Sequence, residues 1–383
     1  MSTILTIILV AINYLPMPEP LKNYYNEAFF DTLSATLEKA IKGFDKKEFI
    51  KKIFNKDWPQ LELKQRIRHI TTVLHDFLPA DFKKAADVLI KITDLTLAGR
   101  ESAMNYFYSF LPDYVEVYGI NDYTGSMKAL EKITCLSSAE FAIRPFIVKY
   151  PQTLQQMMDW TKHPNPMVRR LASEGARPRL PWAMALPAFK KDPSPLLPIL
   201  EALKTDPAET VRRSVANNLN DIAKDNPEIV MAIVKRWQGT HPNTDWIIKH
   251  GSRTLLKKGH NDALDAFGLK RGLKVDVSGI KITPGKLKIG EKATLDFSLI
   301  LKEKNPEKLR VEYGIYYVKA NGAANRKVFK ITENNYQPGK PVAFNRNLRF
   351  DDMTTRRHYP GIHKISVVVN GKEIGETSVE LLK

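Results

Sequence analysis

Two segments near the middle of the chain repeat one another. Residues 165–176 read NPMVRRLASEGA and residues 206–218 read DPAETVRRSVANN, and their Val-Arg-Arg triplets start 43 residues apart, at Val168 and Val211. A weaker third copy, TDWIIKHGSRTLLKKG, covers residues 244–259. Helical repeats of about 40 residues are typical of HEAT-like proteins, in which each helix pair buries its apolar face against the next pair. The middle of the chain is therefore predicted to be an α-solenoid.

Helical periodicity extends on both sides of these copies. Windows such as FFDTLSATLEKAIKGF (29–44) and DFKKAADVLIKITDLTL (81–97) place apolar residues three and four positions apart, and Pro or Gly separates one window from the next. The pattern predicts a HEAT-like repeat domain over residues 18–269. In the first copy, Asn165 and Pro166 predict the helix start, and the helix should end near Gly175 because prolines follow.

From about residue 270 the pattern changes to strand-like alternation with a period of two. Turn sequences containing Pro-Gly, Asn-Gly or Lys-Asn separate the strand-like runs. This pattern predicts a mainly α protein in which an all-β immunoglobulin-like sandwich, residues 270–383, follows the helical repeats. The predicted strands contain LKVDVSGIKI, KATLDFSLIL, KLRVEYGIYYV, KVFKIT, HKISVVV and EIGETSVELL.

The first 17 residues, MSTILTIILVAINYLPM, are apolar but match no targeting segment. They have no basic start and no small-residue cleavage site, and they are too short to span a membrane comfortably. A normal polar entry into the helical region follows Met17. We therefore expect residues 1–17 to be a mis-called or disordered extension and Met17 to be the true start.

The net charge of the chain is strongly positive. It carries 59 Lys and Arg against 42 Asp and Glu, a net charge of +17. Residues 270–383 hold 23 of the basic and 12 of the acidic residues, so the sandwich alone contributes +11. Such a charge favours a polyanionic partner, nucleic acid before an anionic membrane surface, and the sandwich is a predicted DNA clamp. The alternative for such a domain is a soluble sandwich whose edge strands carry lysines that prevent pairing with other strands.

Metal and redox chemistry have little support in the sequence. Cys135 is the single cysteine, so neither an internal disulfide nor a cysteine zinc site can form, and a reducing compartment fits. The chain contains no HExxH, EF-hand or Walker pattern. No metal or other cofactor is expected.

One acid, Glu174, stands in a run of basic residues, RRLASEGARPRLPWA (169–183). An ordinary solvated ion pair with Arg170 would contribute only about 0.3 to 0.5 kcal/mol. A phosphate-binding surface is the second interpretation, although a carboxylate there would repel the ligand. A site at which the acid meets a cation is the third. The surrounding residues are Arg169, Arg170, Arg177, Arg179 and Trp182.

The second copy raises the same question. Arg213, Asn217 and Asp221 lie at four-residue spacing on one helix face, and adjacent repeats could bring Asp221 near Glu174. A surface helix position is the alternative for Asp221.

In the third copy one continuous helical stripe is predicted. A core tryptophan with a satisfied histidine accounts for its first two residues, and cations at its far end are candidate phosphate contacts. The residues are Trp246, His250, Arg253, Lys257 and Lys258.

Together these motifs resemble a known family. SSAEFAIRPF (137–146), the run 169–183, VRRSVANNLNDIAKDNP (211–227) and WIIKHGSRTLLKKGH (246–260) are similar to the HEAT-repeat alkylpurine DNA glycosylases of the AlkC/AlkD superfamily, specifically the AlkC branch. The similarity covers about residues 18–269, and the sandwich resembles the immunoglobulin-like domain of part of that branch.

The resemblance implies a DNA repair enzyme. Such an enzyme would remove cationic alkylated bases, N3-methyladenine before others, from duplex DNA without enclosing the base in a deep pocket. Transferred by motif, Glu174 and Asp221 would be the catalytic carboxylates and Trp182 would line the lesion site. A cationic base leaves without strong protonation, so negative charge beside the developing sugar cation is what catalysis needs.

Two rival classes of function remain at this stage. One is a non-catalytic DNA-binding or damage-sensing scaffold, and the other is a HEAT scaffold for acidic proteins. Retention of both acids and of Trp182 argues against the first. The resemblance implies a cytoplasmic monomer that associates with the nucleoid when it acts on double-stranded DNA. The predicted DNA contacts are Arg169, Arg170, Arg177, Arg179, Arg213, Arg253, Lys257 and Lys258.

Overall fold

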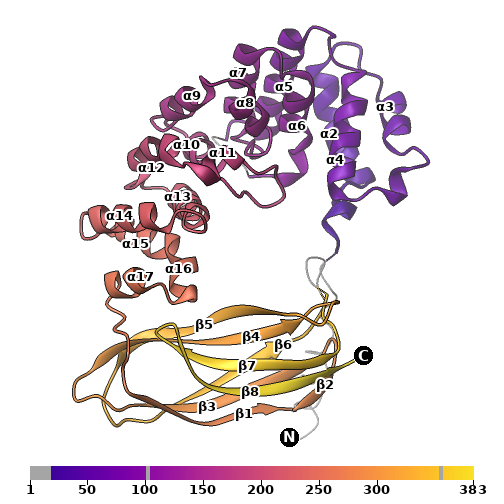
Figure 1. The fold of residues 1–383 in the computed structure, drawn as a ribbon. Coiled ribbons are helices and arrows are strands. Elements are labelled where there is room, and N and C mark those ends of the chain that lie inside the picture. Colours follow the sequence, from indigo (N-terminus) through magenta and orange to yellow (C-terminus); the bar gives the residue numbers. More distant parts are fainter. Residues whose placement is uncertain (1–18, 101–103, 353–356) are drawn as a thin grey trace, which may run out of the picture. The chain divides into compact units, whose positions relative to one another are not determined.

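The computed structural model describes residues 19–100, 104–352 and 357–383, and Figure 1 shows its ribbon. The chain divides into two compact units, the first ending at Asn218 and the second starting at Leu219. This division falls inside one helix, α13 (Glu209–Ile222). The expected extension 1–17 lies outside the described residues.

The first unit is helical, as its periodicity predicts. Neighbours along the chain pack on one another, as α9 does on α10, and α2 packs on α5 and α4 on α6. Before α13 the helices are α2 (Glu27–Ala40), α3 (Lys46–Ile53), α4 (Leu63–His75), α5 (Phe82–Leu97), α6 (Phe110–Tyr118), α7 (Tyr123–Ile133), α8 (Ile143–Lys149), α9 (Thr153–Trp160), α10 (Pro166–Glu174), α11 (Pro187–Lys191) and α12 (Leu197–Leu203).

Helix α10 has the predicted boundaries. The Asn165 side chain caps it by accepting a 2.8 Å hydrogen bond from the Met167 amide, and Pro166 is its first residue. Asn at this position satisfies an otherwise orphaned amide, and proline fits a first turn that needs no amide. The helix ends at Glu174, and Gly175 follows as its C-cap. Both ends of the helix are therefore explained by local sequence.

The third copy is not one continuous helix, so the predicted stripe from Trp246 to Lys257 is wrong. Helix α15 (Pro242–Gly251) ends before Ser252, and α16 (Arg253–Lys258) starts after it. The first two residues of the stripe therefore belong to a different helix from the last two. Helices α14 (Pro227–Trp237) and α17 (Asn261–Ala266) complete the helical part of the second unit.

An all-β region follows α17, as predicted. Within the described residues its strands form a three-stranded sheet, β1-β3-β6, and a five-stranded sheet, β2-β8-β7-β4-β5, with antiparallel pairing except between β2 and β8. The strands are β1 (Val275–Thr283), β2 (Lys286–Lys288), β3 (Lys292–Leu301), β4 (Glu307–Val318), β5 (Ala324–Tyr336), β6 (Val342–Arg349), β7 (Gly361–Val369) and β8 (Lys372–Leu382).

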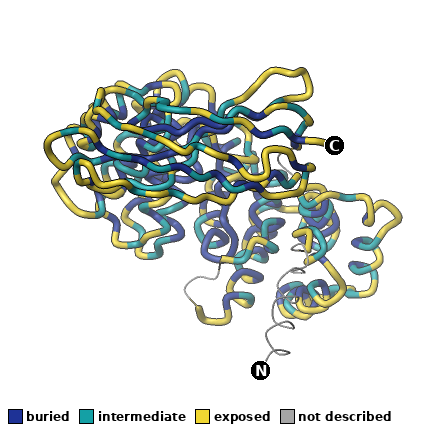
Figure 2. The backbone as a smooth tube through the Cα atoms, turned by 90° about the horizontal axis from the view of Figure 1, so that it is seen from below, coloured by how far each residue is buried: buried dark blue, intermediate teal, exposed yellow. Residues whose placement is uncertain are grey.

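The core of the β region lies between these sheets. In β3, buried and partly exposed residues alternate strictly from Ala293 to Leu301, as a half-buried strand requires. Leu295 and Leu299 pack in one cluster with Val311 and Val367 from the other sheet. Figure 2 shows buried stretches inside the strands and exposed residues in the connecting loops.

The last helices and the β region meet inside the second unit. Lys249 Nζ on α15 donates to Glu333 Oε1 at 2.6 Å, and Lys308 Nζ donates to the Phe267 carbonyl at 3.1 Å. Gly259 and Gly371 touch backbone to backbone, because a Cβ on Gly371 would lie 2.5 Å from Gly259 Cα. This junction is polar and closely packed.

Candidate active site

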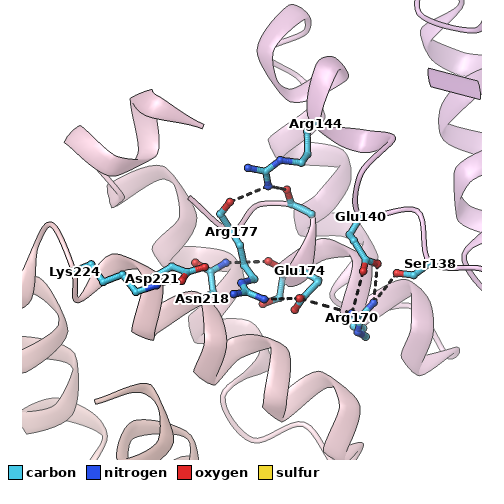
Figure 3. Close-up of polar contacts among 11 residues, drawn as sticks. Ser138, Glu140, Arg144, Arg170, Glu174, Arg177, Asn218, Asp221 and Lys224 are labelled. Atoms are coloured by element: carbon cyan, nitrogen blue, oxygen red, sulfur yellow. Dashed lines mark hydrogen bonds and ion pairs between the residues drawn. The ribbon is translucent and has the colours of Figure 1, made fainter. Parts of the chain in front are cut away.

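Glu174 is buried at the end of α10, so the interpretation as a solvated ion pair is wrong. The residue is 6% exposed. Arg177 Nη1 donates to its Oε1 at 2.6 Å, and Arg170 Nη2 lies 3.8 Å from the same oxygen (Figure 3). Among the described residues no donor contacts Oε2. One carboxylate oxygen is thus anchored by guanidinium groups, and the other takes part in neither of these contacts.

A second acid, Glu140, shares the guanidinium of Arg170. Arg170 Nη1 donates to Glu140 Oε2 at 3.0 Å and to Ser138 Oγ at 2.6 Å. Burial alone would lower the pKa of Arg170, but the carboxylates of Glu140 and Glu174 raise it above its ordinary value. Arg170 is therefore a fixed cation between two carboxylates. The sequence prediction missed Glu140, although it lies in the motif SSAEFAIRPF, because 30 residues separate it from Arg170.

Arg144 organises the loop that follows α10. Its side chain is fully buried. Nη1 donates to the carbonyl of Arg177 (Figure 3) and to that of Gly175, both at 2.8 Å. Nε donates to the carbonyl of Met184 at 2.7 Å. Three charge-assisted hydrogen bonds from one rigid guanidinium fix both ends of this loop.

Trp182 lies in that loop with an unusual backbone. Its φ is +67°, in the left-handed region that tryptophan rarely adopts, and the residue is 61% exposed. Lys64 Nζ on α4 donates to the Trp182 carbonyl. A left-handed non-glycine residue costs about 1 to 3 kcal/mol, so such residues cluster where function requires them. The predicted role of Trp182 at the lesion remains a prediction.

The arginines around Glu174 differ in their exposure. Arg170 and Arg177 are largely buried, and Arg169 forms a two-bonded ion pair with Asp206 at 2.6 and 3.0 Å. Their guanidinium groups therefore bind protein acceptors, which disfavours the phosphate contacts predicted for them. Arg179 is exposed, as is Arg213.

Asp221 is buried near the end of α13, in the second unit. It is 1% exposed, so the alternative of a surface helix residue is wrong. Lys224 Nζ donates to its Oδ1 at 2.8 Å. The preceding residue, Asn220, accepts a hydrogen bond from the Thr254 amide at 3.1 Å, which ties the end of α13 to α16. Asn218, in the first unit, donates to the Ser173 carbonyl at 2.9 Å.

The aromatic start of the third copy is not in the core, contrary to prediction. Trp246 is 39% exposed and stacks on His250 with ring centroids 5.0 Å apart. Arg253 Nη1 donates to the His250 carbonyl at 2.9 Å. Lys257 is partly buried, and this burial lowers its pKa. Lys258 is exposed to solvent.

The described residues contain no cluster of three or more His, Cys, Asp or Glu able to hold a metal ion. No helix in the described ranges is long and apolar enough to cross a membrane.

Comparisons with known proteins agree with the motifs. A family described as DNA alkylation repair enzyme matches residues 131–259, and one described as the C-terminal Ig-like domain of uncharacterised protein YhaZ matches residues 276–383. The chain is 43% identical over 353 residues to the uncharacterised protein YhaZ of Bacillus subtilis (strain 168), with 92% of this chain and 96% of that protein covered.

A solved structure also matches over most of the chain. It is the Pseudomonas fluorescens alkylpurine DNA glycosylase AlkC, bound to DNA that contains an abasic site analogue. The TM-score is 0.86 and the identity 36%, with 95% of this chain and 100% of that chain covered. The resemblance predicted from the motifs is thereby confirmed, and this chain belongs to the AlkC branch of the alkylpurine DNA glycosylase family that carries a C-terminal Ig-like domain.

Proposed function

We propose that this protein is a DNA glycosylase that hydrolyses the bond between deoxyribose and a cationic alkylated base, N3-methyladenine above others, in duplex DNA. The observation that carries the proposal is the environment of the Glu174 carboxylate, which is buried. Guanidinium groups anchor its Oε1, and no hydrogen-bond donor among the described residues contacts its Oε2. Family membership supports the same reaction class.

The chemistry needs little beyond fixed negative charge. The bond from sugar C1′ to the base nitrogen breaks, and its electron pair leaves with the base, which becomes neutral. Positive charge then develops on the sugar, where a preorganised carboxylate stabilises it without having to reorganise. Water bonds to C1′ and gives its proton to a carboxylate and then to solvent, which leaves an abasic site.

In our proposal one acid stabilises the sugar cation and a second acid acts on the water. Glu174 faces the developing sugar cation through Oε2, and Asp221, held by Lys224, orients or deprotonates the water. Arg170 and Arg144 position the site rather than bind DNA. Trp182 lines the lesion site.

Exposed cations would supply the phosphate contacts. Arg179, Arg213 and Lys258 are exposed, and residues 270–383 carry a net +11. Neutralisation of phosphates by such groups releases counterions and makes binding depend on salt. The partner is double-stranded DNA with alkylated bases, bound by a monomer, and the sandwich is a clamp on that DNA.

Release of methylated bases from alkylated duplex DNA tests the proposal. Glu174→Gln and Asp221→Asn should each lower the single-turnover rate about 100-fold or more with DNA affinity kept, because each removes charge without changing shape. Glu38→Gln on α2 and Asp262→Asn on α17 alter exposed acids and serve as matched controls. Tight DNA binding with no base released by the wild type would instead identify a non-catalytic damage-sensing scaffold.

A further inference from the structure

A cavity of about 520 Å³ opens in the first unit beside the Glu174 site. Helices α4 and α6 contribute to its walls, together with the segment that carries Glu140 and the loop that carries Trp182. Its lining is mainly apolar, and its volume lies in the range of small-molecule sites. Because it includes Glu140 and Trp182, it adjoins the residues of the proposed reaction.

Four aromatic side chains contribute to the lining of this cavity. Tyr106, Phe107, Phe141 and Trp182 all line it. Tyr106 is 63% exposed, although an aromatic residue of this size is normally buried. Phe107 is fixed by stacking on Tyr24, with ring centroids 4.6 Å apart. Rigid and partly exposed rings of this kind suit a flat aromatic ligand.

Helices α4 and α6 supply several of the polar groups in the cavity. Arg68 holds Asp113 with two hydrogen bonds of 2.8 and 2.9 Å, and lies 3.8 Å from Glu116. Burial and the Asp113 carboxylate raise the pKa of Glu116, although Arg68 and Lys64 oppose the rise. Nothing in the proposed reaction uses Glu116. In its neutral form it presents one donor and one acceptor to the cavity.

We propose that this cavity binds the base released by the reaction, an N-alkylated adenine, with Glu116 recognising its polar edge between the aromatic rings. A carboxyl group matches the neighbouring ring nitrogen and amino group of adenine: a neutral acid pairs with the neutral ring, and a carboxylate pairs with the protonated ring. The base enters after its bond to the sugar is broken, so no flipping into a deep pocket has to precede the reaction. This inference rests on the proposed function.

Titration of the full chain with free 3-methyladenine, without DNA, tests the inference. Wild type should bind the base saturably and should not bind thymine. Tyr106→Ala and Glu116→Leu should each weaken binding about tenfold or more. Glu116→Gln should stay within about threefold of wild type, because an amide also presents a donor beside an acceptor. Glu38→Gln is the control.

The outcomes separate this inference from the proposed function. It is overturned if wild type does not bind 3-methyladenine, or if Tyr106→Ala and Glu116→Leu bind it as wild type does. Tyr106 is exposed, so its variant remains informative even if Glu116→Leu fails to fold. Saturable, Glu116-dependent binding of the free base without release of bases from DNA would support the cavity and refute the glycosylase.

Discussion

Arg177 donates a 2.6 Å hydrogen bond to Glu174 across the end of α10, three residues away. Both side chains are almost completely buried. Water cannot replace either partner in such a setting, so each charge depends on the other. Because Arg144 donates to the carbonyl of Arg177, Glu174 is linked through Arg177 to the loop that contains Trp182.

Arg177→Met should destabilise the protein by about 3 to 5 kcal/mol, because it leaves Glu174 as a buried charge with less compensation. Adding Glu174→Gln to this variant should restore most of the loss, since the uncompensated charge is then gone. Urea unfolding of the wild type, both single variants and the double variant measures the coupling. Additive effects in this cycle would show that the pair does not stabilise the fold.

The backbone of Trp182 allows strain to be separated from function. Trp182→Gly and Trp182→Ala both remove the indole, but only glycine adopts φ of +67° without a steric cost. We expect Trp182→Gly to be more stable than Trp182→Ala by about 1 kcal/mol, with base release lowered in both. Thermal unfolding and single-turnover assays provide the two readouts. Equal stabilities would mean that the loop relaxes when the ring is removed.

The elements that the sequence predicted well are those whose signals are local. Asn165 and Gly175 mark the ends of α10, and alternation marks β3. Strand β6 is absent from the predicted strands because half of its residues, VAFNRNLR, are polar, and a strand at a sheet edge tolerates that composition.

The candidate site was predictable in its residue types but not in its contacts. Glu174 and Asp221 stand out in the sequence as acids near cations, yet the local sequence does not show that both are buried. Arg170 looked like a phosphate ligand because Glu140, its partner, is 30 residues distant. Trp246 is predicted to lie in the core because sequence periodicity shows which residues lie on the same face of a helix. It does not show whether another element packs against that face.

Glu333 should make the stability of the second unit depend on pH. Burial alone would raise the pKa of Glu333, but hydrogen bonds from Lys249 and Arg310 lower it to about 2 from an ordinary 4.5. A lowered pKa in the folded state stabilises the fold above pH 4.5, and this stabilisation, about 3 kcal/mol at most, is lost as pH falls towards 2.

Calorimetric unfolding of wild type and Glu333→Gln between pH 2 and 7 checks this expectation. The variant should be less stable than wild type near pH 7, and the difference should disappear towards pH 2. Glu376→Gln, which alters an exposed pair with Lys364, is the matched control and should change stability little. A difference that stays constant across the whole pH range would contradict the role of this carboxylate.

Substitution of Gly371 tests whether the backbones of the last helices and of the sandwich must be in direct contact. Gly371→Ala introduces a Cβ that would lie 2.5 Å from Gly259 Cα, at a residue with φ of +81°. Gly339→Ala is a matched control, because Gly339 has φ of +69° but nothing within 4 Å of the new Cβ. Both variants should lose about 1 kcal/mol from the left-handed backbone, and Gly371→Ala should lose at least about 1 kcal/mol more because the junction has to separate. Thermal unfolding measures both losses, and equal shifts in Tm would show that the contact between Gly259 and Gly371 adjusts without cost.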